Sequence, residues 1–257
     1  MIDESETMNL PFTEAFARLG SEEREAYHRA VFLQMETPAA AEVREQYYRG
    51  LLRAMGEHVR IGCGVRIINP QHISLGNGVV IDDNCTLIAR SERGITLGDE
   101  TRLKVGVYLD TEGNDGYIEV GKRVYIGTGC CLHGHRGLEI GDDTLLAQNI
   151  TITPYSHRFE DPQQPIIRQG GHSRRITIGR DCYLGMCVCV LWSADIGDGA
   201  VVGAGSVVVK SVPPYHVAVG VPTRVIRRRG TGGSATAGTV SDARHASSPT
   251  GNAPAEL

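Results

Sequence analysis

Residues 118–152 read IEVGKRVYIGTGCCLHGHRGLEIGDDTLLAQNITI, and the spacing of their aliphatic side chains decides the fold. Within each half of this stretch a large aliphatic residue stands at every sixth position: Val120, Ile126 and Leu132, then Ile140, Leu146 and Ile152. A period of six matches neither the 3.6-residue period of an α-helix nor the two-residue period of a long strand. It predicts short strands joined by sharp turns and wound into a β-helix.

The same spacing extends outward on both sides of this stretch. Seven triplets lie between residues 55 and 212, and they start at Met55, Leu75, Leu97, Val120, Ile140, Ile178 and Ile196. The spacing is six inside every triplet, whereas consecutive triplets are separated by 8, 10, 11, 8, 26 and 6 residues. Because a three-sided coil has one such corner per turn, every insertion leaves from the same edge of a triangular prism. We therefore predict a mainly β fold, a parallel β-helix of about seven three-hexad coils.

Three of the seven cysteines fit this repeat as core residues. The position four residues after a repeat start is small or β-branched in most coils, and Cys85, Cys130 and Cys182 occupy that same position. We expect these thiols to fill the core, since free cysteine packs as a small apolar residue. Cys187 and Cys189 form a CxC motif without a second pair at zinc-finger spacing, so no metal is expected.

The overall composition excludes several classes of protein. Lys plus Arg number 26 and Asp plus Glu 30, a net charge of −4, which excludes a basic protein that neutralises nucleic-acid phosphates. No apolar run reaches the roughly 18 residues of a membrane-spanning helix. The start MIDESETMNLPF is acidic, unlike a signal peptide, and the seven cysteines form no paired framework. We expect a cytoplasmic protein with free thiols, no nucleic-acid partner and no membrane span.

Composition also divides the chain into three parts. Residues 1–54 carry helix-forming segments, SEEREAYHRAVFLQ and a stretch that starts at Pro38 and stops at Gly56, and they predict an N-terminal helical cap. Residues 55–229 are predicted to form the β-helix, with loop 153–177 and a C-terminal segment. Residues 230–257 are small and polar, and we expect a disordered tail.

The largest break in the repeat, loop 153–177, is where we expect chemistry. A regular coil wall offers few convergent groups, and functional residues concentrate in loops that a rigid scaffold holds. The loop contains His157, Glu160, Asp161 and His172. The alternative is that it only covers an oligomer edge.

Three motifs carry a resemblance to a known family. They are GDDTLLAQNITITPYSHRF (141–159), ITIGRDCYLG (176–185) and IGDGAVVGAGSVVVKSVPPYHVAVGVPTRVIR (196–227). They resemble the hexapeptide-repeat acyltransferases, and most closely the maltose and galactoside O-acetyltransferase branch, over roughly residues 26–229. The resemblance implies a left-handed coil, a homotrimer, acetyl-CoA as co-substrate and no required metal.

The resemblance also implies roles for individual residues. His157 matches the general base, and an imidazole with a pKa near 6.5 suits removal of a proton from an acceptor hydroxyl. A backbone amide close to Met186 would meet the oxyanion. The residues implied in coenzyme A binding are Tyr183, Gly185, Met186, Ala204, Lys210 and Arg227, the last two at its phosphates.

The acceptor side departs from the family pattern. The corner that precedes the His157 coil reads LHGHRG, so His133 and His135 are candidates for contact with a small-molecule or glycan acceptor, together with Asn149 and Tyr155. Trp192 stands where the family usually has proline.

Four functions remain open at this stage. The predicted activity is transfer of an acetyl group from acetyl-CoA to a sugar or glycoconjugate hydroxyl. The alternatives are N-acylation of an amino-sugar and a non-catalytic binding scaffold. A γ-type carbonic anhydrase shares the prism, but its His-x4-His-Gly pair is absent, and Thr128 stands five residues before His133.

Overall fold

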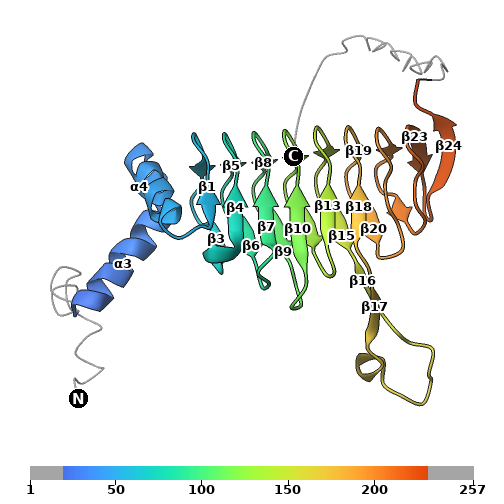
Figure 1. The fold of residues 1–257 in the computed structure, drawn as a ribbon, viewed down its shortest axis with the longest axis horizontal. Coiled ribbons are helices and arrows are strands. Elements are labelled where there is room, and N and C mark those ends of the chain that lie inside the picture. The colour runs from blue at the N-terminus through green and yellow to red at the C-terminus, as the bar shows by residue number, and fades with distance from the viewer. Residues whose placement is uncertain (1–19, 231–257) are drawn as a thin grey trace, which may run out of the picture.

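The computed structural model describes residues 20–230, and its main body is the predicted three-sided β-helix (Figure 1). Parallel strands from successive coils make up each of three sheets. The first sheet contains β1 (Ala54–Met55), β4 (Ile73–Leu75), β7 (Gly94–Leu97), β10 (Tyr117–Val120), β13 (Leu138–Ile140) and β18 (Ile176–Ile178). The second contains β2 (Arg60–Ile61), β5 (Val80–Ile81), β8 (Arg102–Leu103), β11 (Tyr125–Ile126), β14 (Leu145–Leu146), β19 (Tyr183–Leu184), β21 (Val201–Val202) and β23 (His216–Val219), and β24 (Arg224–Arg228) closes it antiparallel to β23. The third contains β3 (Arg66–Ile68), β6 (Thr86–Ile88), β9 (Tyr108–Asp110), β12 (Cys131–His133), β15 (Thr151–Thr153), β20 (Cys189–Leu191) and β22 (Val207–Val208).

The six-residue period sets the register between coils. Val120 lies opposite Ile140, which lies opposite Ile178, so equivalent aliphatic residues of successive coils stack in one column. Such columns fill the core, and the large side chains in them are fully buried. The tight spacing of parallel strands leaves no room for a side chain at some corners. A Cβ on Gly127 would lie 2.5 Å from the carbonyl oxygen of Ala147 on the next coil.

The predicted core thiols are confirmed. Cys85, Cys130 and Cys182 are buried, and all three are free. Burial raises the pKa of the Cys85 and Cys130 thiols to about 11 and also raises the pKa of Cys182. These thiols are therefore protonated packing residues at neutral pH.

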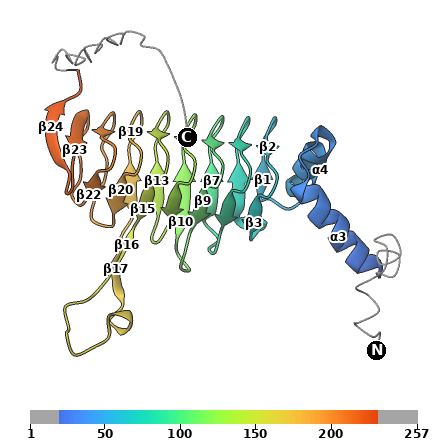
Figure 2. The same cartoon turned by 180° about the vertical axis from the view of Figure 1, so that it is seen from behind.

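Two helices precede the coil stack, and the second of them lies against its first coil while the first slopes away from the stack (Figure 2). They are α3 (Ser21–Gln34) and α4 (Pro38–Arg49). The side chains of Arg44 and Tyr48 on α4 are buried, and they donate hydrogen bonds of 3.0 Å to the carbonyl oxygens of Ile61 and Val65 on the first coil. These bonds satisfy polar groups at the end of the core.

The expected end of the second helix at Gly56 is wrong, because α4 ends at Arg49. The amide of Leu52 bonds the carbonyl oxygen of Tyr48 (2.9 Å), and the next amide, that of Arg53, bonds the carbonyl oxygen of Ile73 (3.0 Å). Pairing with the coil therefore takes over the backbone donors before another helical turn forms.

The insertions leave from one edge of the prism, as predicted. They follow strands of the third sheet and precede strands of the first, and we call this the insertion edge. The 3₁₀ turn η1 (Pro70–His72) lies there. The longest insertion is an arm that projects from the stack (Figures 1 and 2), made of antiparallel β16 (Tyr155–His157) and β17 (Gly171–Ser173), with η2 (Ile166–Arg168) in its tip. The division into cap, β-helix and tail stays a prediction, and residues 1–19 and 231–257 lie outside the described residues.

Candidate active site

A row of aromatic rings runs along the insertion edge and ends at His157. It contains Tyr108, His133, His135, Tyr155 and His157, and we call it the ring row. Consecutive ring centroids lie 6.0, 6.3, 5.0 and 4.9 Å apart. The row brings together the two corner histidines and the loop residues that the sequence predicted for the acceptor side.

Tyr155 makes the two closest contacts in the row. Its ring stacks on His135 at an interplanar angle of 26° and meets His157 edge-on at 86°. Both geometries are favourable for aromatic pairs. The His157 residue itself is exposed. The Tyr155 ring, which is held by its stack on His135, thus supports one side of the His157 imidazole and leaves the rest of that imidazole open to solvent.

Glu112 lies between the two corner histidines. Its carboxylate oxygens are 3.1 Å from His133 Nδ1 and 2.5 Å from His135 Nε2. His133 Nδ1 and His135 Nδ1 are both buried, and neither makes a well-directed hydrogen bond among the described residues. Burial holds the pKa of His135 below its usual value, because the loss of solvation outweighs the attraction of Glu112. His135 is therefore a neutral ring at pH 7.

Asp110 anchors the loop that carries Glu112. Its buried carboxylate accepts two hydrogen bonds from Arg90 (2.9 and 3.0 Å), one from the Tyr108 hydroxyl (2.9 Å) and one from the Glu112 amide (2.9 Å). Burial alone would raise the pKa of Asp110, but these bonds hold it below its usual range. The sequence did not single out Glu112 or Asp110, because nothing in their local pattern links them to histidines on another coil.

Ring contacts fasten both strands of the arm to the coils. On the outgoing strand, the ring of Tyr155 stacks on His135 at a corner of the coil stack, with centroids 5.0 Å apart. The same ring lies over Gly171 of the returning strand, where a Cβ would come within 2.2 Å of the ring and its hydroxyl. On the returning strand, His172 stacks on Trp192 of the next coil, with centroids 5.4 Å apart and an interplanar angle of 16°. Trp192, noted in the sequence as a departure from the family's proline, is thus explained as an anchor for the arm.

The residues predicted for the acyl donor lie elsewhere on the chain. Gly185, Met186 and Ala204 lie in turns between the second and third sheets, at the opposite edge of the third sheet from the insertion edge. Neighbouring turns are joined through backbone bonds, such as Gly205 N–H to the Met186 carbonyl oxygen (2.8 Å). We call this the turn edge.

The remaining donor-side residues are exposed near the C-terminal end. Tyr183 is on β19 of the second sheet, Lys210 follows β22, and Arg227 is on β24. One chain by itself therefore does not bring the predicted base and the predicted donor residues together. Asn149, assigned with the acceptor side, also lies at the turn edge and away from the ring row.

Two absences within residues 20–230 bear on other kinds of function. Within residues 20–230, no group of three or more His, Cys, Asp and Glu side chains is arranged to hold a metal ion. In the same described range, no helix is long and apolar enough to cross a membrane.

Comparisons with known proteins place the chain in a family. Residues 78–111, 117–154 and 175–210 match the hexapeptide repeat of succinyl-transferase. The Escherichia coli protein assigned to lipopolysaccharide biosynthesis as the O-acetyl transferase WbbJ is 32% identical over 157 residues, which cover 56% of this chain and 80% of WbbJ. The chain belongs to the hexapeptide-repeat acyltransferase family.

Other relatives in the family match over smaller shares of their length. A protein of Mycobacterium tuberculosis assigned as an acetyltransferase is 32% identical over 165 residues, 63% of this chain and 52% of the relative. The galactoside O-acetyltransferase of Escherichia coli is 35% identical over 134 residues, 51% of this chain and 63% of the relative. The chain thus spans about half to just under two thirds of these two relatives.

A solved structure shares the fold. AntD, an N-acyltransferase from Bacillus cereus in complex with dTDP and 3-hydroxybutyryl-CoA, matches with a TM-score of 0.52 over 72% of this chain and 88% of AntD. The two chains are 24% identical, so this likeness concerns the β-helix alone.

Proposed function

We propose that this protein transfers an acetyl group from acetyl-CoA to a hydroxyl of a sugar or glycoconjugate, with His157 as the general base. The single observation that carries this proposal is the ring row, because it ends at the exposed imidazole of His157, which contacts the Tyr155 ring, and that ring is in turn stacked on His135. The names of the relatives support the reaction class, since a galactoside O-acetyltransferase and an O-acetyl transferase of lipopolysaccharide biosynthesis are among them.

The proposed chemistry is a direct transfer. His157 takes the proton of the acceptor hydroxyl while the oxygen attacks the thioester carbonyl, and the C–S bond then breaks. The backbone amide of Met186 would stabilise the oxyanion of the tetrahedral intermediate. The leaving thiolate of coenzyme A receives the proton from the imidazolium, which returns His157 to its neutral form.

This chemistry requires more than one copy of the chain. The base lies at the insertion edge and Met186 lies at the turn edge, on opposite sides of the third sheet. A closed ring of three copies can place the insertion edge of one against the turn edge of the next. We therefore propose a homotrimer with acetyl-CoA bound between prisms, in a cytoplasmic protein.

Tyr155 and the corner histidines take different parts in this proposal. Tyr155 touches His157, so it is a positioning residue in addition to a contact for the acceptor. We also propose that His133 and His135 contact the acceptor. They would do so through the parts of their imidazole rings that Glu112 does not cover.

The decisive experiment measures release of coenzyme A thiol with a panel of free sugars, nucleotide sugars and amino-sugars. His157→Ala should lower turnover by about 10²- to 10⁴-fold and leave acetyl-CoA affinity nearly unchanged, since the base touches the acceptor. Activity confined to amino-sugar amines would replace O-acetylation by N-acylation. Acetyl-CoA binding without turnover on any acceptor would favour a scaffold.

The donor side has its own test. Lys210→Ala and Arg227→Ala should weaken coenzyme A binding in a salt-dependent way, with a smaller effect on turnover at saturation. Calorimetric titration at two ionic strengths measures this. Equal affinities for the parent and both variants would remove these residues from the proposed site.

A further inference from the structure

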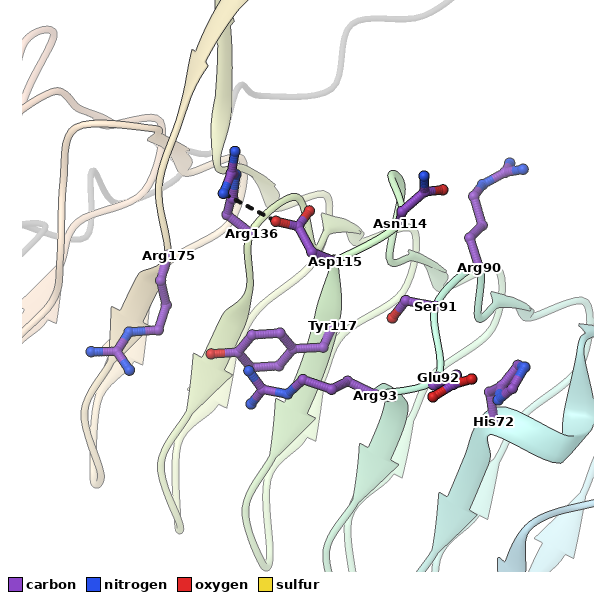
Figure 3. Close-up of a pocket in the computed structure, with 10 residues that line it drawn as sticks. All are labelled: His72, Arg90, Ser91, Glu92, Arg93, Asn114, Asp115, Tyr117, Arg136 and Arg175. Atoms are coloured by element: carbon purple, nitrogen blue, oxygen red, sulfur yellow. Dashed lines mark ion pairs between the residues drawn. The ribbon is translucent and has the colours of Figure 1, made fainter.

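A groove opens beside the ring row, on the insertion edge of the more N-terminal coils (Figure 3). It has a volume of about 800 Å³, which is within the range of sites that hold drug-sized ligands. Its lining comes from several corner segments that are far apart in the sequence, among them residues 90–93, Arg136 and Arg175. It is therefore a feature of the stacked insertions and not of one loop.

The groove adjoins the proposed active site through shared loops. Glu112 and Asp115 belong to one corner loop, and Glu112 contacts the ring row while Asp115 lines the groove. On the next coil, His135 is in the ring row and Arg136 lines the groove, where it pairs with Asp115 at 3.1 Å. A ligand in the groove can continue along the insertion edge toward His157.

The groove is lined by polar and aromatic groups. In the described part of the chain, none of its lining side chains is aliphatic. Four arginines line it, and each has a carboxylate partner within 3.2 Å: Arg90 with Asp110, Arg93 with Glu119, Arg136 with Asp115 and Arg175 with Glu139. Side chains of these arginines are half exposed, at 52–62%. Each guanidinium group of the lining is thus compensated by a carboxylate.

This chemistry selects a class of ligand. A hydroxyl group both donates and accepts hydrogen bonds, so a chain of sugar rings matches a surface of guanidinium groups that are already paired with carboxylates. A polyphosphate would face the carboxylates of Glu92 and Asp115 in the lining, and it would compete with the carboxylate partner of each arginine. The volume exceeds what one sugar ring needs.

We propose that this groove binds the non-reacting sugar units of an oligosaccharide acceptor, so that the enzyme prefers a glycan chain over a free monosaccharide. This inference rests on the proposed function for the reacting end of the chain. It adds that binding of remote units contributes to kcat/KM, as remote contacts do in other enzymes.

A matched pair of variants tests the groove. Arg136 and Arg123 both adopt left-handed backbone, with φ of 57° and 55°, and both pair with an aspartate, but Arg123 lies in a turn between the first and second sheets, at an edge away from the groove. Asparagine tolerates this conformation, so Arg136→Asn and Arg123→Asn are comparable changes. The readout is the ratio of kcat/KM for maltotriose to that for glucose, and for a galactotriose to that for galactose.

The parent should prefer one trisaccharide over its monosaccharide, and Arg136→Asn should lower that ratio about tenfold or more, the scale of a hydrogen bond to a charged group. Arg123→Asn should keep the parental ratio. Equal kcat/KM for mono- and trisaccharides, or equal ratios in parent and Arg136→Asn, would overturn the inference while leaving the proposed function in place.

A second measurement is independent of turnover. Calorimetric titration of the same trisaccharides into the protein should detect binding that Arg136→Asn weakens and Arg123→Asn does not. Failure of thiol release with every acceptor would refute the proposed function, and this titration would then still decide on the groove. Binding of inorganic tripolyphosphate in place of both trisaccharides would overturn the assignment to a glycan.

Discussion

Replacing Tyr155 tests whether the ring row positions His157. Tyr155→Ala removes two aromatic contacts, the stack on His135 at 5.0 Å and the edge contact to His157 at 4.9 Å. Such a pair contributes about 0.5–1.5 kcal/mol, and only the edge contact touches His157, so the variant loses about 0.5–1.5 kcal/mol of direct support for the imidazole. At 1.36 kcal/mol per factor of ten, turnover should fall about 2- to 13-fold.

Tyr155→Phe is the matched control, because it keeps both ring contacts and removes only the hydroxyl. Its turnover should stay close to that of the parent. The assay is the initial rate of thiol release at saturating acetyl-CoA, with kcat and the acceptor KM determined separately for each variant. The loss in Tyr155→Ala should be in kcat, since a displaced base slows the chemical step.

Two results would refute this reasoning. If Tyr155→Phe loses as much activity as Tyr155→Ala, the hydroxyl and not the ring is responsible, and Tyr155 acts on the acceptor. If Tyr155→Ala keeps the parental kcat, the ring row does not position His157. Unchanged acetyl-CoA affinity in both variants is required for either interpretation.

Three further predictions concern the arm, the core and the pH response. Gly171→Ala places a Cβ within 2.2 Å of the Tyr155 ring, so kcat should fall about as far as in Tyr155→Ala while the unfolding midpoint of the coil stack changes little; parental kcat would contradict the packing. Leu132→Ala should lower the free energy of unfolding by about 2–5 kcal/mol, because Leu132 is fully buried, whereas Leu145→Ala at a 41% exposed site should change it by about 0.5 kcal/mol, both measured by denaturant titration. The lowered pKa of His135 means that its contribution to stability is complete above the ordinary pKa of about 6.5 and is lost as the pH falls toward the lower pKa of the folded state. The thermal unfolding midpoint of His135→Asn should therefore fall less between pH 7 and 5 than that of the parent. Parallel curves of midpoint against pH for parent and variant would contradict this.

Local pattern was sufficient for much of the fold. The six-residue period predicted the coils and their core columns, because each strand is so short that its buried position is set by the neighbouring turns. The unequal gaps between triplets predicted that all insertions share one edge, and the structure confirms this. The end of α4 could not be predicted in this way, since it depends on a carbonyl of the second coil that competes for the amide of Arg53.

The candidate site also contains some residues that the sequence could single out and others that only the structure shows. Its histidines could be singled out in the sequence, because His133, His135 and His157 stand in breaks of a regular repeat. Their partners could not, because Glu112 reaches both corner histidines, and Tyr155 reaches His135, only after successive coils stack.

The sequence by itself thus determined the β-helix and the edge that carries its insertions, and it singled out His157 as the proposed base. Tertiary structure alone decided how the His157 imidazole is held and what lies beside it. The stack of Tyr155 on His135, the anchor of His172 on Trp192 and the paired arginines of the groove join residues of different coils. The physical reason is that a repeat encodes the spacing of coils through local turns, whereas contacts between insertions depend on the length and side chains of each loop after the coils have stacked.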